Sequence, residues 1–173
     1  MKRCLVVLFS DFEEIEAVVS VDILRRAGVA VTTATMGNKL LVVGAHGIGV
    51  VADGLIENFD EGDFDAILIP GGAGVFPLRG NEKLQQLVTS FSHGRKLVAA
   101  ICAAPILLED AKLLKGRKYA AHPCIHGALS EPPQEKPVVE DGNLITANGP
   151  RAAIDFALAV AKYLTGGPVA VGI

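Results

Sequence analysis

Short runs of apolar residues alternate with helix-like stretches along most of the chain. Runs rich in Val, Ile and Leu predict buried strands, because a strand covered on both faces has no polar side. Strands are expected at Arg3–Phe9, Val29–Thr35, Ala66–Ile69, Lys96–Ile101, Arg117–Ala121 and Leu144–Ala147. Helices are expected at Phe12–Ala27, at Glu82–Phe91, from the end of strand 96–101 through Ala111, and at Pro150–Leu164.

The regular alternation of strands and helices predicts an α/β fold with a mostly parallel sheet and helices on both of its faces. Lys39–Val43 and Ile48–Ala52 are expected to form a separate short strand pair. The loop-rich segment His122–Lys136 is interpreted as a surface excursion. A length of 173 residues, half of them hydrophobic, suits a single domain over residues 1–173.

Charge and cysteine content narrow the class of protein. A net charge of −3 offers no basic patch, so neither nucleic acid nor a membrane surface is expected as a partner. The apolar run Cys4–Phe9 is too short for a signal sequence or a membrane span. Three scattered cysteines argue against a disulfide framework and favour a reducing, cytoplasmic location.

Three segments rich in candidate chemistry each follow a predicted strand. They are Ser10–Glu16, Pro70–Gly74 and Cys102–Pro105. In open α/β sheets, ligands bind beyond the carboxyl ends of the strands. The sequence therefore predicts a functional site where these three segments meet.

Cys102 is the candidate nucleophile. It stands between Ala100 and Ala104 at a strand-to-helix turn, an arrangement that parallels the nucleophile elbow, in which small neighbours allow a sharp turn. The following helix is expected to lower the pKa of the thiol below its usual value of about 8.5. The alternative is that Cys102 is simply a small buried residue, which is the interpretation favoured for Cys4.

Glu16 is the candidate acid. It falls on the apolar stripe of the first helix, whereas Glu13 and Glu14 fall off the stripe and are expected to face solvent. The stripe is formed by Phe12, Val19, Ile23 and Ala27. A carboxylate is costly to bury unless it is paired or protonated. Glu16 is therefore expected either to pair with Arg26 or to face the site as a protonated acid.

Backbone N–H groups of Gly72 and Ala103 are candidates for an oxyanion hole, with Gly71 as a further substrate-binding residue. Phosphate-binding and dinucleotide-binding glycine patterns are lacking, and no cofactor is expected. His122, Cys124 and His126 match no standard zinc spacing, so no metal is expected either. His122 joins the site only if the fold carries it to Cys102, and His46 and His93 are expected at the surface.

The segments that carry a family resemblance span most of the chain. They are Phe12–Ala17, Val21–Gly28, Leu68–Gly72, Ala99–Pro105, Ala121–Pro123 and Gly149–Pro150. With them the chain resembles the ThiJ/PfpI superfamily, and most closely the subfamily of the Parkinsonism-associated deglycase. The resemblance implies a flavodoxin-like three-layer sandwich of the class I glutamine-amidotransferase-like type, usually a homodimer.

The resemblance also implies roles for individual residues. Cys102 corresponds to the reactive nucleophile, Glu16 to its acidic neighbour and His122 to a nearby histidine, with Gly72 and Ala103 as backbone donors. Activities in the family include glyoxalase and deglycase action on methylglyoxal adducts, cysteine-oxidation sensing, chaperone action and, in the PfpI branch, proteolysis.

This chain departs from the family pattern at three places. Ala103 stands where the protease branch has histidine, so peptidase activity is not expected. His46 stands where the deglycase has arginine, which argues against an anion pocket there. The sequence also ends soon after Gly167–Val169, and a more open site than that of the deglycase is expected.

The function expected from the sequence is a cofactor-independent, cysteine-dependent glyoxalase or deglycase that acts on methylglyoxal or its early adducts. The alternative is a redox-responsive stress protein or chaperone that uses oxidation of Cys102. A dimeric module without catalytic activity is the third possibility.

Overall fold

Seven strands form the central sheet of the computed structural model, which describes residues 1–172. Their order is β5-β2-β1-β6-β7-β9-β8, and every neighbouring pair is parallel except β8 and β9. The strands are β1 (Arg3–Leu8), β2 (Ala30–Thr35), β5 (Gly54–Leu55), β6 (Ala66–Ile69), β7 (Leu97–Ile101), β8 (Val138–Asp141) and β9 (Leu144–Ala147).

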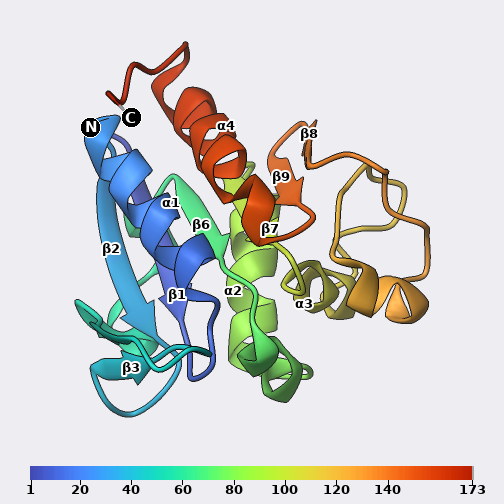
Figure 1. Cartoon of the computed structure of the whole chain (residues 1–173), viewed down its shortest axis with the longest axis horizontal. Coiled ribbons are helices and arrows are strands. Elements are labelled where there is room, and N and C mark those ends of the chain that lie inside the picture. Colours follow the sequence, from blue (N-terminus) through green and yellow to red (C-terminus); the bar gives the residue numbers. More distant parts are fainter. Residues whose placement is uncertain (173) are drawn as a thin grey trace.

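Helices cover both faces of this sheet. The helices α1 (Glu14–Arg26) and α4 (Ala153–Thr165) pack against each other on one face. The helices α2 (Glu82–His93) and α3 (Pro105–Asp110) lie on the other face (Figure 1). The predicted flavodoxin-like three-layer fold is therefore confirmed. Among residues 1–172, no helix is long and apolar enough to cross a membrane.

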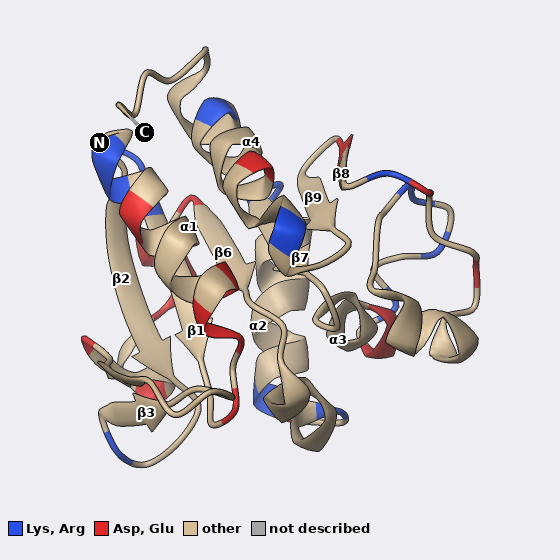
Figure 2. Ribbon diagram, viewed as in Figure 1, with Lys and Arg blue, Asp and Glu red and all other residues tan. Residues whose placement is uncertain are grey.

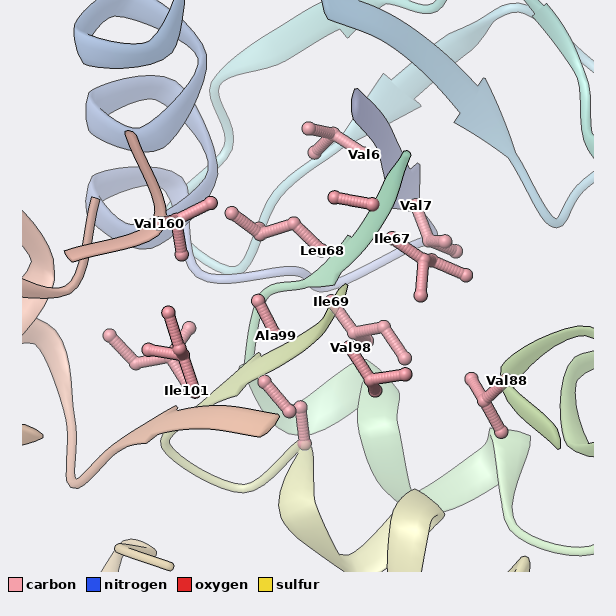
Figure 3. Close-up of a cluster of buried hydrophobic side chains, with 14 of the residues drawn as sticks. Val6, Val7, Ile67, Leu68, Ile69, Val88, Val98, Ala99, Ile101 and Val160 are labelled. Atoms are coloured by element: carbon pink, nitrogen blue, oxygen red, sulfur yellow. The ribbon is translucent and has the colours of Figure 1, made fainter. Parts of the chain in front are cut away.

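The core lies between the central strands and the two helical layers. Every residue of β6 and β7 is buried, as is all of β1 after Arg3. Side chains such as Leu68 and Ile101 pack with their neighbours on the adjacent strands (Figure 3). Burial on both faces explains why these strands appear in the sequence as continuous apolar runs.

The predicted strand at Arg117–Ala121 is wrong. This segment forms no strand, because β7 and β8 already occupy the two edges of β9. The Ala120 N–H instead donates to the Thr146 hydroxyl at 2.8 Å. The strands β8 and β5 were not expected, since β8 is a partly exposed edge strand that ends in two acidic residues and β5 has only two residues.

Other predicted elements agree with the structure to within a few residues. The expected strand pair is an antiparallel hairpin of β3 (Leu41–Val43) and β4 (Gly49–Val51). The last helix begins as a 3₁₀ turn at Pro150–Ala152. Further 3₁₀ turns lie at Ile56–Asn58, Glu61–Asp63, Ala73–Leu78 and Pro123–Ala128. Because β1, β6 and β7 are neighbours, their carboxyl ends meet at one edge of the sheet.

Candidate functional site

Cys102 lies on a tight turn immediately after β7. Its φ angle is 65°, a left-handed conformation that costs a residue with a side chain about 1–3 kcal/mol and is held only by its surroundings. Cys102 N–H donates to the Ala147 carbonyl at 2.9 Å, and the Cys102 carbonyl accepts from His122 N–H at 2.9 Å. The helix α3 begins at Pro105. The structure thus has the strand–turn–helix geometry expected of a nucleophile elbow.

Gly71, at the end of β6, lies directly against this turn. A Cβ atom at Gly71 would lie 2.6 Å from Cys102 Cβ and 2.8 Å from Glu16 Oε2. Only a residue without a side chain fits between these two groups. The next residue, Gly72, has a φ of 106°, and a Cβ there would lie 2.3 Å from the Asp11 carbonyl oxygen. The three strand ends therefore meet around Cys102 and Glu16.

Glu16 is fully buried in the first turn of α1. Its Oε2 accepts a hydrogen bond of 2.6 Å from Gly71 N–H. Its Oε1 is also buried and has no hydrogen-bond partner within residues 1–172. Arg26, the partner considered from the sequence, instead bonds to the exposed Asp22 at 2.8 Å. The ion-pair interpretation of Glu16 is wrong, because Arg26 lies too far along the helix on its solvent side.

The environment of Glu16 favours a protonated acid. Burial raises the pKa of Glu16 from 4.5 to about 7, although the Gly71 N–H and the Cys102 thiol both act to lower it. The nearby charge of Glu13 contributes to the increase. Acidic residues gather in the chain around the beginning of α1 (Figure 2). Glu16 therefore gains or loses its proton near neutral pH.

The pKa of the Cys102 thiol is raised, which corrects the sequence-based expectation. Burial is the largest cause, and the negative charge of Glu16 adds to it, whereas Ala103 N–H lowers the pKa. The helix that follows has only six residues, too few for its dipole to outweigh these effects. The charge of Glu16 disfavours a thiolate, whereas the Cys102 thiol favours an ionised Glu16, so the pair retains one proton, on Cys102, once Glu16 ionises near neutral pH.

The predicted backbone donors differ in their availability. Gly72 N–H has no acceptor among the described residues and remains a candidate for binding a substrate oxygen. Ala103 N–H points to the thiol. Gly71 N–H donates to Glu16 and holds the acid in place, so it is not free for a substrate oxygen; contact of Gly71 with a substrate stays a prediction.

His122 reaches Cys102 through its backbone. Its N–H bonds to the Cys102 carbonyl, and its Nδ1 accepts a hydrogen bond of 3.2 Å from Cys124 N–H. A neutral His122 therefore carries its proton on Nε2. In residues 1–172, the imidazole makes no hydrogen bond to the thiol. A catalytic role for the His122 side chain stays a prediction.

Glu14 is a residue that sequence reasoning misjudged. It was expected to face solvent but is only 5% exposed. Its carboxylate accepts hydrogen bonds from His46 N–H at 2.6 Å, from Ile48 N–H at 3.4 Å and from His46 Nδ1 at 2.9 Å. Burial alone would raise the pKa of Glu14, but these hydrogen bonds outweigh it and lower the pKa to about 2. Glu14 thus fastens the β3–β4 hairpin to the start of α1.

Little in the sequence indicates the contact between the Glu14 carboxylate and the β3–β4 hairpin. Gly44 packs against the Glu14 carboxyl group, where a Cβ atom would lie 2.5 Å away, but a single hairpin glycine does not identify its neighbour. His46 is exposed, as expected, and the hydrogen bond to Glu14 raises its pKa. A charged His46 is paired with acidic groups and is not free to bind an anion.

Possible metal ligands were searched among residues 1–172. One group, Glu13, Glu14 and His46, places three ligand atoms within 4.8 Å of one another. The Glu14 oxygens already accept the hydrogen bonds of the hairpin, and the helix terminus beside them is positive, so we assign this group to holding the hairpin. His122, Cys124 and His126 form no such group in the described part of the chain.

Comparison with known sequences gives consistent matches. The sequence pattern of the DJ-1/PfpI family matches residues 2–163. Protein DJ-1 homolog B of Arabidopsis thaliana is 38% identical over 167 residues, covering 95% of this chain and 38% of that protein. Protein dj-1beta of Drosophila melanogaster is 35% identical over 169 residues, which cover 95% of this chain and 90% of that protein. This chain spans less than half the length of the Arabidopsis relative.

Two further comparisons bear on the chemistry. YraA of Bacillus subtilis (strain 168), whose name suggests a cysteine protease, is 32% identical over 152 residues, covering 86% of this chain and 90% of that protein. The structure of oxidized Toxoplasma gondii DJ-1 superimposes with a TM-score of 0.89 at 36% identity, covering 95% of this chain and 91% of that one.

Proposed function

This chain belongs to the DJ-1/PfpI family, and we propose that it is a cofactor-independent glyoxalase or deglycase that acts on methylglyoxal or its early adducts. The observation that carries the proposal is the pair formed by Cys102 and Glu16. A thiol and a buried carboxyl group share one proton beside the unoccupied Gly72 N–H.

The first step of the proposed reaction is attack on the aldehyde carbon. The Cys102 thiolate forms a carbon–sulfur bond, and the carbonyl oxygen takes a proton to give a hemithioacetal. Gly72 N–H stabilises the oxyanion as it develops. Glu16 holds the proton that leaves the thiol, and its unpartnered Oε1 is the atom that delivers it.

The second step moves a proton between the two substrate carbons. Glu16 in its ionised form removes the proton from the thiol-bearing carbon and returns it to the neighbouring carbon, which gives a thioester of lactate. Water then hydrolyses the thioester and releases the thiol. The sum is methylglyoxal plus water giving lactate, with no oxidant, reductant or cofactor. On a hemiaminal formed with an amine, Cys102 sulfur bonds to the same carbon as the carbon–nitrogen bond breaks, the amine leaves with the proton held by Glu16, and the same hemithioacetal results.

Steady-state lactate production from methylglyoxal tests this proposal. We expect turnover by the native chain and its loss in Cys102→Ser, because a hydroxyl group beside Glu16 is a far weaker nucleophile. Cys4→Ala, which removes a buried thiol of β1, is the matched control and is expected to retain turnover. Equal rates for the native chain and Cys102→Ser would overturn the assignment of Cys102.

A redox-responsive protein is the second candidate, favoured by the buried, unpartnered Oε1 of Glu16. A protonated Oε1 beside Cys102 would donate to a sulfinate formed by oxidation of the thiol. Peroxide-dependent oxidation of Cys102, without lactate production, is the outcome that would favour it. Hydrolysis of casein is the corresponding test for the activity that the name of YraA suggests, and we do not expect it.

A cytoplasmic location and a homodimer remain part of the proposal. All three thiols are free, which suits a reducing compartment. Exposed apolar side chains on α1 and on the β3–β4 hairpin, such as Val18 and Val51, offer a surface for a second copy. Sedimentation equilibrium of the native chain is expected to give twice the mass of one chain, and a monomer would contradict this.

A further inference from the structure

We infer that Cys102 and Cys124 form a reversible disulfide within one chain, and that Cys124 thereby protects the reactive thiol from irreversible oxidation. The inference rests on Cys102 being the reactive thiol of the proposed function. It adds a role for a cysteine that the proposed reaction does not use.

Backbone contacts bring Cys124 to the site. His122 N–H bonds to the Cys102 carbonyl at 2.9 Å, which places the chain at residue 122 beside the catalytic turn. Cys124 follows two residues later, and its own N–H turns back to His122 Nδ1 at 3.2 Å. These two hydrogen bonds place Cys124 two residues from a direct backbone contact with Cys102, and a negative charge on Cys124 raises the pKa of Cys102.

The turn that carries Cys124 can move at little cost. Cys124 lies in the 3₁₀ turn Pro123–Ala128, in which Ile125 alone is buried. A disulfide needs Cα atoms about 4.4–6.8 Å apart and a specific torsion about the sulfur–sulfur bond. Adjusting a short exposed turn next to Cys102 disturbs few buried contacts, because most of its residues face solvent.

Cys4 is not a competing partner. It is fully buried in β1, and burial raises the pKa of its thiol to about 12. Cys124, in contrast, is exposed to solvent. Of the two remaining thiols, Cys124 is therefore the one that can reach an oxidised Cys102.

The chemistry proceeds in two balanced steps. First, the Cys102 thiolate attacks a hydroperoxide; the oxygen–oxygen bond breaks, the sulfur becomes a sulfenic acid, and water or an alcohol leaves. Second, the Cys124 thiolate attacks this sulfur, forming the disulfide as the hydroxyl group leaves as water with the proton of Cys124. A thiol reductant such as dithiothreitol restores both thiols. The disulfide blocks nucleophilic attack by Cys102 and forestalls further oxidation to the sulfinic acid.

The test treats the full chain with about two equivalents of hydrogen peroxide, the amount that takes one thiol to a sulfinic acid, and then maps its cysteine peptides without reduction. We expect the native chain to lose about 2 Da, to show a linked Cys102–Cys124 peptide and to recover both thiols in dithiothreitol. Cys124→Ser should instead gain about 32 Da at Cys102, the mass of a sulfinic acid. Cys4→Ala is the matched control and should behave like the native chain.

Several outcomes would overturn the inference. One is a native chain that gains about 32 Da at Cys102 as readily as Cys124→Ser while Cys124 remains open to alkylation. Another is a covalent dimer on a non-reducing gel, which would show that the partner thiol comes from a second chain. Unchanged methylglyoxal turnover or circular dichroism in Cys124→Ser confirms that the variant is folded.

The failure of this inference and that of the proposed function can be told apart. Disulfide formation without lactate production would refute only the proposed reaction. Lactate production without a disulfide, in the same preparation, would refute only the role of Cys124.

Discussion

The backbone N–H of Gly71 donates a hydrogen bond of 2.6 Å to Oε2 of Glu16. This bond connects the end of β6 to the first turn of α1, elements that lie far apart in the sequence. It uses one oxygen of the carboxyl group and leaves the buried Oε1 for the thiol of Cys102 or for a substrate. Glu16 is thus held in place without being neutralised by a basic residue.

Glu16→Gln should separate acid–base catalysis from stabilisation of the thiolate. Glutamine keeps an acceptor for Gly71 N–H and a donor for sulfur, but it cannot transfer a proton. We expect lactate formation to fall by roughly 10²–10⁴-fold, the usual contribution of a general acid or base. Because the negative charge of Glu16 helps to raise the pKa of Cys102, alkylation of Cys102 at neutral pH should be at least as fast as in the native chain.

Glu16→Ala is the companion variant, and the rate of iodoacetamide labelling as a function of pH is the measurement. Alanine removes the donor as well as the charge, so the pKa of Cys102 should be higher than in Glu16→Gln. Glu57→Gln, on an exposed 3₁₀ turn, is the control. Native turnover in Glu16→Gln would exclude Glu16 as the proton carrier and leave His122 as the candidate. Equal thiol pKa values in both variants would show that the donor does not reach the sulfur.

The stability of the protein should depend on pH through Glu16. Its pKa is about 7 in the folded chain and 4.5 in the unfolded chain, so the folded state binds more protons between these values. The contribution of Glu16 to stability is therefore fully present below pH 4.5, and it is lost as pH rises to about 7. From the difference in pKa, the decline amounts to roughly 3 kcal/mol.

Urea unfolding of the native chain and of Glu16→Gln, between about pH 5 and about pH 8, measures how the contribution of Glu16 to the free energy of unfolding depends on pH. The native chain should lose stability relative to the variant as pH rises, because glutamine does not ionise. Comparing the two in a Cys102→Ser background removes the titration of the thiol. A constant difference across the range would mean that Glu16 is not abnormally protonated in the folded state.

Gly71→Ala should damage the site more than the fold. The added methyl group would lie 2.6 Å from Cys102 Cβ, so the turn and the carboxyl group must move apart. A displacement of about 1 Å between reacting groups can cost roughly 10²-fold in rate, and we expect a loss of that order in lactate formation.

Gly62→Ala is the matched control for Gly71→Ala, because a Cβ atom at Gly62 meets nothing within 4 Å. Turnover should be retained in this control. The thermal unfolding midpoint, measured alongside, shows whether each variant is folded. If Gly71→Ala is folded and fully active, the close packing around Gly71 does not position Cys102 and Glu16.

Glu14→Gln should loosen the β3–β4 hairpin. Hydrogen bonds to a charged group contribute about 1.5–3 kcal/mol, and the variant keeps their geometry while losing the charge. Because the pKa of Glu14 is lowered from 4.5 to about 2, its contribution is present above pH 4.5 and is lost as pH falls towards 2. Amide hydrogen exchange at His46 and Ile48 is the measurement.

Glu13→Gln provides the comparison for Glu14→Gln, since Glu13 approaches His46 only at 3.8 Å. Its hairpin amides should exchange as slowly as those of the native chain. Faster exchange in Glu13→Gln than in Glu14→Gln would reassign the contact that fastens the hairpin to Glu13.

Local sequence was sufficient for most of the secondary structure and for the place of the site. The strand ranges Ala66–Ile69 and Leu144–Ala147 agree with β6 and β9, because strands buried on both faces are apolar at every position. The turn at Cys102 could be expected from its small neighbours and from Pro105. Each of these properties depends on residues adjacent in the chain, so each is readable from a short stretch of sequence.

Tertiary structure decided the electrostatics and the contacts between distant segments. Burial and the charge of Glu16 raise the pKa of Cys102, whereas the sequence suggested the opposite direction. The burial of Glu14 depends on a hairpin turn that is distant in the sequence, as shown by its hydrogen bond to His46, 32 residues away. The pKa of a side chain depends on its desolvation and its hydrogen bonds. Both are determined by all the residues packed around it in the fold, and only some of these are its neighbours in the sequence.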